Sequence, residues 1–318
     1  MKGTYKIIIS NSKVSFSLEL ERNITIICGN SATGKTTLIG LIRDYEQLGK
    51  ASGVTIQCKK PCRVLSNVDW KYRLDAIHDS IVFLDEGNEF VRSQDFAQAI
   101  RGTDNYYVII NRESLSQLPY SVNSILKLKT TSRKKVTYIR SYPEYSNLAE
   151  PIEQINRVDE IITEDSNSGH DMFSRIAQDS GVSCLSAQGK SNIFSCLANH
   201  SGEQILVIAD GAAFGAELEK IYKLQEVSTG KIRLYLPESF EWLLLKSGVL
   251  GNRTPHDILA DPAAHIESRD FFSWEQYFTA LLVDLTRDTY LHYNKNRLNP
   301  VYLQPANIEK VLDAMGKK

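Results

Sequence analysis

The sequence lacks the features of a membrane or secreted protein. No apolar run approaches the roughly 20 residues that cross a bilayer, and the apolar stretch within residues 1–10 is too short for a signal peptide. Its five cysteines are odd in number and scattered over 318 residues, as expected for reduced thiols rather than a disulfide framework. We therefore expect a cytoplasmic protein with no membrane contact.

The chain also lacks a charge excess of either sign. Its 37 basic and 38 acidic residues give a formal net charge of −1, so no global field attracts nucleic acid. Contact with DNA or RNA would need a local site, and the basic run at residues 133–135 is one candidate, although such runs are usually solvated. The length and the apolar content of 42% allow two globular domains.

The most informative segment is residues 29–36, which match the phosphate-binding pattern G-x-x-x-x-G-K-[ST]. A β-branched run precedes it at residues 23–28, and helical apolar spacing follows at residues 37–48. In such a loop, backbone N–H groups and the helix N-terminus bind phosphates, Lys35 contacts the β- and γ-phosphates, and Thr36 coordinates Mg²⁺. The candidate ATP-binding residues are Gly29, Asn30, Ser31, Ala32, Thr33, Gly34, Lys35, Thr36 and Thr37.

Two further apolar strands end in polar residues. Residues 80–84 lead to Asp85, which would hold Mg²⁺ through water, and to Glu86, which as a general base would favour hydrolysis over binding alone. Residues 106–110 lead to Asn111 and Arg112, either of which could contact the γ-phosphate. The alternative is that both segments are ordinary polar turns, with a solvated arginine in the second.

The second half of the chain alternates strands and helices. A hairpin at residues 125–129 and 136–140 precedes a polar linker, which predicts a domain boundary near residue 150. Predicted strands at residues 158–163, 182–186, 204–209 and 231–236 are each followed by a helical segment, which indicates a parallel sheet with crossover helices.

Acids follow three of these four strands, namely Glu164 with Asp165, Asp210, and Glu238. Ligands bind at the carboxyl ends of strands in open α/β sheets, where gathered carboxylates repel one another unless a cation or protons neutralise them. One hypothesis is therefore a site for Mg²⁺ or Mn²⁺. The alternative is that each acid caps the helix that follows it.

The same order of motifs resembles the Toprim domain of topoisomerases, primases and OLD-family nucleases. Glu164 follows the first strand, Gly189-Lys190 the second and Asp210 the third. OLD-like proteins join a P-loop ATPase to a C-terminal Toprim domain, so the resemblance covers about residues 5–250. It implies that Glu164 and Asp210 bind Mg²⁺ for phosphodiester chemistry, that Lys190 contacts the scissile phosphate, and that the protein acts in anti-phage defence.

The sequence departs from that family in two ways. The second Toprim motif is Asp-x-Asp, whereas this chain has Asp210-Gly211-Ala212, so that Glu238, Glu241 or Asp165 would have to supply the missing carboxylate. The chain also lacks the ABC-type signature of OLD nucleases.

These patterns predict an α/β fold in three parts. They are a P-loop ATPase domain at residues 1–148, a Toprim-like parallel α/β domain at 149–250, and a mainly helical extension at 251–318. The expected function is ATP binding and hydrolysis that controls metal-dependent nucleic-acid processing. The alternative is a regulatory ATPase whose degenerate Toprim-like domain docks a partner protein. Since P-loop ATPases often complete their sites across a dimer, we expect a homo-oligomer.

Overall fold

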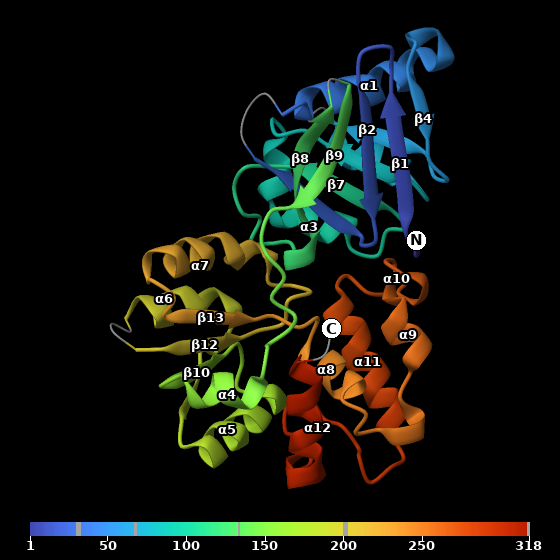
Figure 1. Ribbon diagram of the computed structural model, residues 1–318. Helices are drawn as coiled ribbons and strands as arrows, with labels where there is room; N and C mark the ends of the chain where they lie inside the picture. The colour runs from blue at the N-terminus through green and yellow to red at the C-terminus, as the bar shows by residue number, and fades with distance from the viewer. Residues whose placement is uncertain (30–32, 67–68, 133, 200–202, 317–318) are drawn as a thin grey trace. The chain divides into compact units, whose positions relative to one another are not determined.

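The computed structural model has a mixed α/β fold and describes residues 1–29, 33–66, 69–132, 134–199 and 203–316. The chain divides into two compact units (Figure 1). Unit 1 contains Met1–Pro143 and Asp261–Ser273, and unit 2 contains Glu144–Ala260 and Trp274–Lys318. Among the described helices, none is both long and apolar enough to cross a bilayer.

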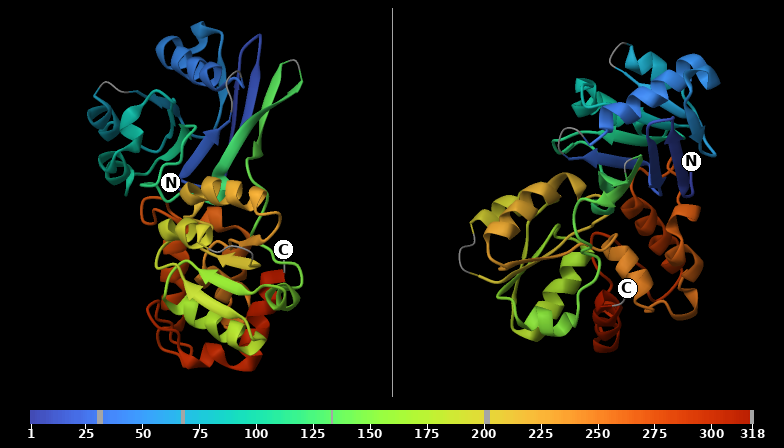
Figure 2. Two further views of the ribbon diagram at one scale, coloured as in Figure 1. Left: turned by 90° about the vertical axis from the view of Figure 1, so that its left-hand side faces the viewer. Right: turned by 45° about the horizontal axis from the view of Figure 1, so that its top comes forward.

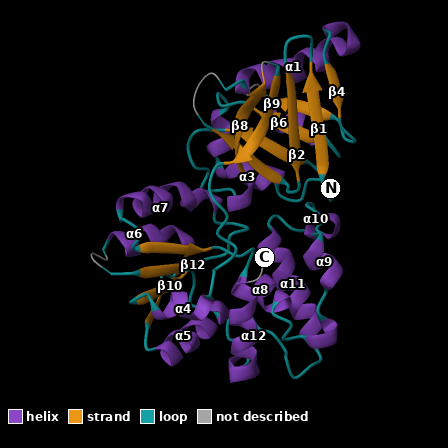
Figure 3. Ribbon diagram, in the orientation of Figure 1, coloured by secondary structure: helices purple, strands orange, loops and turns teal. Residues whose placement is uncertain are grey.

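Unit 1 is built on one sheet (Figure 3). Its strand order is β4-β1-β2-β9-β8-β3-β7-β6-β5. The run β8-β3-β7-β6-β5 is parallel throughout, while β4, β1 and β2 pair antiparallel and β8 with β9 forms the expected hairpin. The strands are β1 (Tyr5–Ser10), β2 (Ser15–Leu20), β3 (Ile24–Cys28), β4 (Thr55–Gln57), β5 (Cys62–Leu65), β6 (Ile81–Leu84), β7 (Tyr106–Ile110), β8 (Ile125–Ser132) and β9 (Lys135–Arg140).

Helices cover both faces of this sheet, because its central strands are apolar on both sides. Val108 of β7 shares a buried cluster with Leu38 and Ile42 of α1. The next side chain along β7 points the other way, and the ring centroid of Tyr107 lies 6.2 Å from that of Phe96 in α3. The helices are α1 (Lys35–Leu48), η1 (Gly49–Ser52), α2 (Trp70–Asp75), η2 (Glu89–Arg92), α3 (Gln94–Ile100), η3 (Val122–Ser124) and α10 (Pro262–His265).

Unit 2 contains a four-stranded parallel sheet in the order β11-β10-β12-β13. Figures 1 and 2 show α4 and α5 on one face of this sheet and α6 and α7 on the other. The strands are β10 (Glu160–Thr163), β11 (Ser183–Ser186), β12 (Ile205–Ile208) and β13 (Ile232–Tyr235). The helices are α4 (Pro151–Asn156), α5 (Ser168–Ser180), η4 (Lys190–Asn192), α6 (Ile193–Ala198) and α7 (Gly215–Val227).

The remaining helices of unit 2 pack together beside this sheet. α11 packs against α8, and α12 packs against both α4 and α8. They bury Phe278 and Leu282 of α11 completely. These elements are α8 (Phe240–Lys246), η5 (Gly251–Arg253), α9 (His256–Ala260), α11 (Trp274–Thr286), η6 (Pro300–Leu303) and α12 (Pro305–Gly316).

Residues 251–318, which the sequence analysis described as one extension, are divided between the two units. Hydrogen bonds tie residues 261–273 to the start of unit 1. The Gly3 N–H donates to the Ala263 carbonyl at 2.7 Å, and the Asn23 amide donates to the Phe272 carbonyl at 2.9 Å. Residues 274–318 belong to unit 2 together with the sheet at 149–250, and the boundary expected after residue 148 falls after Pro143.

Candidate functional sites

The first candidate site lies at the carboxyl edge of the parallel strands of unit 1. β7 lies between β3 and β6, and both pairings are parallel. The register aligns the last residues of the three strands, so Gly29, Asp85 and Asn111, which follow them closely, lie at one edge. The Asn111 N–H donates to the Ile27 carbonyl at 3.2 Å, which fixes the end of β7 beside the start of the phosphate-binding loop.

Two glycines give this loop its path. Gly29 and Gly34 have φ angles of 112° and 94°, a region that side chains other than hydrogen rarely tolerate. A Cβ atom at Gly34 would also lie 3.2 Å from the Phe16 ring. α1 begins directly afterwards at Lys35, and its first turn holds no acidic residue. Because the first N–H groups of a helix have no acceptor within it, this end of α1 suits an anion.

The described loop residues meet at this helix end. Lys35 is buried, at 6% exposure, and its ammonium donates to the Gly29 carbonyl, so it lies across the loop. Thr33 is half-buried, whereas Thr36 and Thr37 are exposed in the first turn of α1. The three predicted residues that lie outside the described part of the chain are Asn30, Ser31 and Ala32.

Asp85 and Glu86, the acids after β6, each contact a neighbouring residue. Asp85 Oδ1 accepts the Glu86 N–H at 2.8 Å, and Arg112 Nε lies 2.6 Å from Glu86 Oε1. The structure thus joins two residues that the sequence left unconnected, the candidate general base and an arginine from the end of β7. Asn111 is buried at 5% exposure, and its amide donates to the Glu113 carbonyl at 2.8 Å. That contact favours a turn-forming role for Asn111.

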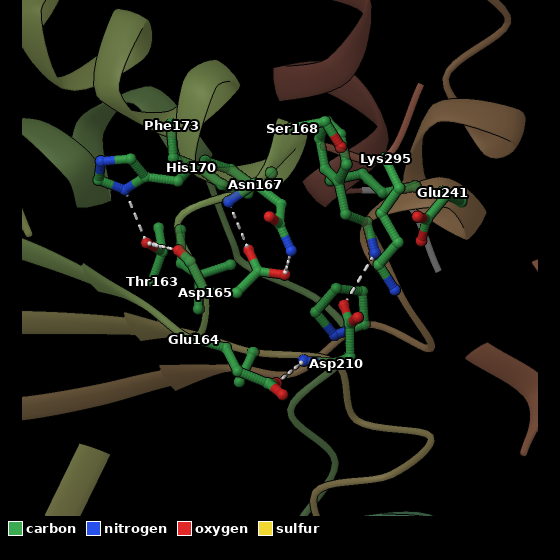
Figure 4. Close-up of a pocket in the computed structure, with 16 residues that line it drawn as sticks. Thr163, Glu164, Asp165, Asn167, Ser168, His170, Phe173, Asp210, Glu241 and Lys295 are labelled. Atoms are coloured by element: carbon green, nitrogen blue, oxygen red, sulfur yellow. Dashed lines mark hydrogen bonds between the residues drawn. The ribbon is translucent and has the colours of Figure 1, made fainter. Parts of the chain in front are cut away.

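The second candidate site is a small cavity in unit 2, which we call the acid pocket (Figure 4). Glu164 and Asp210, which follow the adjacent parallel strands β10 and β12, both line it. Glu164 Oε2 accepts the Asp210 N–H at 3.0 Å, and Asp210 Oδ1 accepts the Phe240 N–H at 2.9 Å. The cavity has about 30 Å³, which admits a water molecule or a monatomic cation but no organic ligand.

Two further charged residues also line the acid pocket. Glu241 is one of the acids that the sequence offered in place of the missing second carboxylate, whereas Lys295 was not predicted. Glu241 is 1% exposed, and its Oε1 accepts the Tyr293 hydroxyl at 2.8 Å. Its Oε2 is buried and has no hydrogen-bond partner in the part of the chain that the structure describes. Lys295 donates to Glu275 at 2.8 Å. A buried carboxylate oxygen without a donor is costly unless a proton or a cation reaches it.

The electrostatics of the acid pocket favour such neutralisation. Burial raises the pKa of Glu164 to about 7, even though the Asp210 N–H bonds to its carboxylate and opposes the change. Burial also raises the pKa of Asp210 well above its usual range, and the carboxylates of Glu275, Glu164 and Glu241 add to that effect, while Lys295 opposes it. Both carboxyls therefore take up a proton, or a cation in its place, more readily than exposed acids do.

Glu164 and Asp210 carry the oxygen donors that a small divalent cation prefers. The described residues contain no ready-made group of three or more His, Cys, Asp or Glu ligands. Mg²⁺, however, is commonly held by one or two carboxylates and several waters. Glu164 Oε1 and Asp210 Oδ2 accept no hydrogen bond from the described residues, so one oxygen of each remains available. The buried Glu241 Oε2 is a third oxygen without a hydrogen-bond partner in the described lining, but the three acids do not form a metal-ligand group.

The structure does not bring every predicted residue into this pocket. Asp165 lines it, but both of its carboxylate oxygens accept from Asn167, at 3.1 and 2.8 Å, in the turn before α5. These bonds make Asp165 part of the turn that leads into α5, which resembles the helix-capping role that the sequence analysis gave as the alternative. Lys190 is not among the lining residues, and its ammonium donates to the Ala213 carbonyl at 2.8 Å. Glu238 also lies outside the lining.

The sequence analysis missed the contributions of Glu275, Tyr293 and Lys295, which come from the region expected to be a helical extension. No motif marks these residues, and only the packing of α8 and α11 brings them close to the sheet. The sequence matches no protein-family model and is similar to no curated protein. The geometry of the two sites therefore carries the functional argument.

Proposed function

We propose that the protein binds ATP with Mg²⁺ and hydrolyses it in unit 1. The observation that carries this proposal is the parallel order β3-β7-β6, with the loop of residues 29–36, Asn111 and the acid pair Asp85 and Glu86 at one sheet edge. Nucleotides bind at such edges, and this loop type binds their phosphates.

Each residue would have a separate role. Lys35 and the first N–H groups of α1 would hold the β- and γ-phosphates, and Thr36 and Asp85 would hold Mg²⁺. When bound, the cation would neutralise phosphate charge. Glu86 would accept the proton of the attacking water, and its ion pair with Arg112 would keep the carboxylate at the sheet edge. A polar turn without a ligand would not need the buried lysine or the positive φ of Gly34.

ATP binding and turnover by single variants test this proposal. We expect Lys35→Ala to abolish ATP binding, and Glu86→Gln to bind ATP while turnover falls by roughly 10²–10⁴-fold, the usual contribution of a general base. Glu89→Gln is the matched control, since Glu89 is an exposed glutamate three residues further along the chain. Undiminished turnover in the Glu86 variant would remove this residue from the mechanism.

For unit 2, we propose a Toprim-like, metal-dependent domain that acts on nucleic acid under control of the nucleotide state, as the resemblance to OLD-family proteins implies. Support comes from Glu164 and Asp210, which follow adjacent parallel strands and share a pocket of the size of one ion. A divalent cation bound there would activate water for phosphodiester hydrolysis. Both carboxylates would hold the cation, and Glu241 would offer its unsatisfied oxygen.

Cleavage assays with the full chain, Mg²⁺ or Mn²⁺, ATP, and DNA or RNA test this second proposal. We expect Glu164→Gln and Asp210→Asn to abolish cleavage, whereas the control Asp257→Asn, an exposed acid of the same unit, should retain it. Absence of cleavage under every combination, or cleavage that survives both variants, would reject the nuclease activity.

One observation favours the alternative, a regulatory ATPase whose unit 2 docks a partner protein. Ala212 stands where the Asp-x-Asp motif has its second acid, and it is buried at 2% exposure. Its N–H donates to the Glu238 carbonyl at 3.1 Å, so the position is occupied by backbone packing. A partner that binds only in the presence of ATP, with no Mn²⁺ bound at Glu164 and Asp210, would support this alternative.

A further inference from the structure

Unit 1 also contains a polar cavity that uses none of the residues of the phosphate-binding loop. Three arginines from three different elements line it, Arg43 of α1, Arg63 of β5 and Arg73 of α2. All three are exposed, and the cavity has about 430 Å³. We call it the arginine pocket. Because α1 packs on β5 and α2 packs beside β5, the fold itself brings these separated residues together.

The arginine pocket carries excess positive charge. Glu46 is the one acid among the residues that line it. Its Oε2 accepts the Val64 N–H at 3.1 Å, and its Oε1 lies 3.8 Å from Arg63 Nη1, too far for a hydrogen bond. Arg73 donates to the Ser66 hydroxyl at 3.2 Å, a neutral partner. Glu46 therefore balances at most one of the three guanidinium groups.

The lining indicates the class of ligand. Among the described residues that line it there is no aromatic ring, and Val64 is the one apolar side chain, so these residues offer little surface for a base or an acyl chain. Guanidinium groups present planar pairs of donors that match phosphate oxygens. A cavity of about 430 Å³ has room for an extended anion.

An exposed ring next to Arg73 in the sequence, although not one of the residues that line the cavity, favours a nucleic-acid strand over other polyanions. Tyr72 precedes Arg73 in α2 and is 81% exposed, which is unusual for a large aromatic side chain. Single-stranded nucleic acids are typically bound by basic grooves that follow the backbone and by aromatic rings on which bases stack. An acidic peptide would use the arginines but not the ring.

We propose that the arginine pocket binds the phosphodiester backbone of a single-stranded nucleic acid, with Tyr72 as a stacking surface beside it. This site is separate from the nucleotide edge of unit 1 and from the acid pocket of unit 2. It supplies the local basic site that a chain of net charge −1 needs in order to bind nucleic acid.

Fluorescence anisotropy of a labelled oligothymidine with the full-length protein tests the proposal. We expect each of Arg43→Gln, Arg63→Gln and Arg73→Gln to weaken binding about tenfold, which corresponds to about 1.4 kcal/mol. Neutralising three phosphates predicts a slope of log affinity against log salt of about −2, and the triple variant should lose this slope. Tyr72→Ala should weaken binding about tenfold without changing the slope.

Arg92→Gln is the matched control, because Arg92 is a half-exposed arginine of the same unit that pairs with Glu113 at 3.0 Å. Circular dichroism of each variant checks that it is folded. Retained oligothymidine binding in a folded triple variant, or an equal loss in the control, would overturn the proposal.

Two competitors test whether the arginine pocket binds other anions in place of a nucleic-acid strand. We expect neither inorganic pyrophosphate, at a matched phosphate concentration, nor an oligoglutamate of equal charge to displace the oligothymidine. Displacement by pyrophosphate would instead indicate a site for free phosphate compounds, and displacement by oligoglutamate a site for acidic peptides. Either result would overturn the assignment to a nucleic-acid strand.

Discussion

Gly211 lies where the chain leaves β12 beside the Asp210 ligand position, and the structure predicts that no larger residue fits there. A Cβ atom at this position would lie 2.5 Å from the Leu236 carbonyl oxygen and 2.8 Å from that of Pro237. Both oxygens belong to the backbone after β13, so the contact cannot be relieved by a side-chain rotation. Ordinary contacts begin near 3.4 Å, and the two segments would have to separate by about 0.9 Å.

That separation sets the expected cost of Gly211→Ala. Overpacking of this kind costs about 1–3 kcal/mol. The movement would also break the two hydrogen bonds that hold the segments together, each worth about 1 kcal/mol. The Gly211 N–H donates to the Pro237 carbonyl at 2.6 Å, and the Ala212 N–H donates to the Glu238 carbonyl at 3.1 Å. We therefore expect unit 2 to lose about 3–5 kcal/mol, or about 10 °C in Tm.

Thermal unfolding by circular dichroism measures this loss, and hydrogen exchange at α8 assigns the transition to unit 2. Gly169→Ala is the control in the same unit. Its Cβ would lie 3.4 Å from the Phe240 side chain, an ordinary contact, and helix α5 favours alanine over glycine. A Tm for Gly211→Ala within 2 °C of the wild-type value would refute the steric argument.

Three further predictions concern individual contacts. Arg112→Ala should lower the ATP turnover number about tenfold and leave KM unchanged, because the candidate base loses its positioning partner; an unchanged turnover number would contradict this. Lys295→Met should destabilise the metal-free protein by about 2 kcal/mol, since the Glu275 carboxylate loses its ion pair. Adding Mn²⁺ should raise the Tm of this variant more than it raises the Tm of the wild type. No change of Tm with Mn²⁺ would contradict this. Hydrogen bonds from the Cys62 thiol and from backbone amides lower the pKa of Cys58 to about 6. The rate of Cys58 alkylation should therefore rise with pH and reach a plateau above pH 7. A rate that still rises at pH 9 would contradict this.

The sequence predicted the elements of the central sheets well, because their signals are local. The run at residues 106–110 coincides with β7, and the helix expected over 37–48 lies within α1 (Lys35–Leu48). Buried parallel strands give continuous apolar runs, and glycines such as Gly34 mark the turns between them. The acids at the strand ends followed from the same patterns, and Glu164 and Asp210 do share a pocket.

Long-range arrangements were not predictable from a single sequence. No local pattern states that β7 lies between β3 and β6, although this order defines the edge that we assign to nucleotide. The division of residues 251–318 between the units depends on contacts such as the Gly3 to Ala263 hydrogen bond, made across some 260 residues. Lys295 reaches the acid pocket through similar packing, so only the folded chain reveals it.

The central claim is that the edge formed by β3, β7 and β6 binds a nucleotide with its metal. A crystal structure with a non-hydrolysable ATP analogue and Mn²⁺ tests it most directly, because anomalous scattering locates the manganese. We predict a manganese peak about 2.1 Å from the Thr36 hydroxyl, on the Asp85 side of the analogue, with the β- and γ-phosphates against Lys35. An analogue bound elsewhere, or no nucleotide at this edge under saturating conditions, would contradict the account.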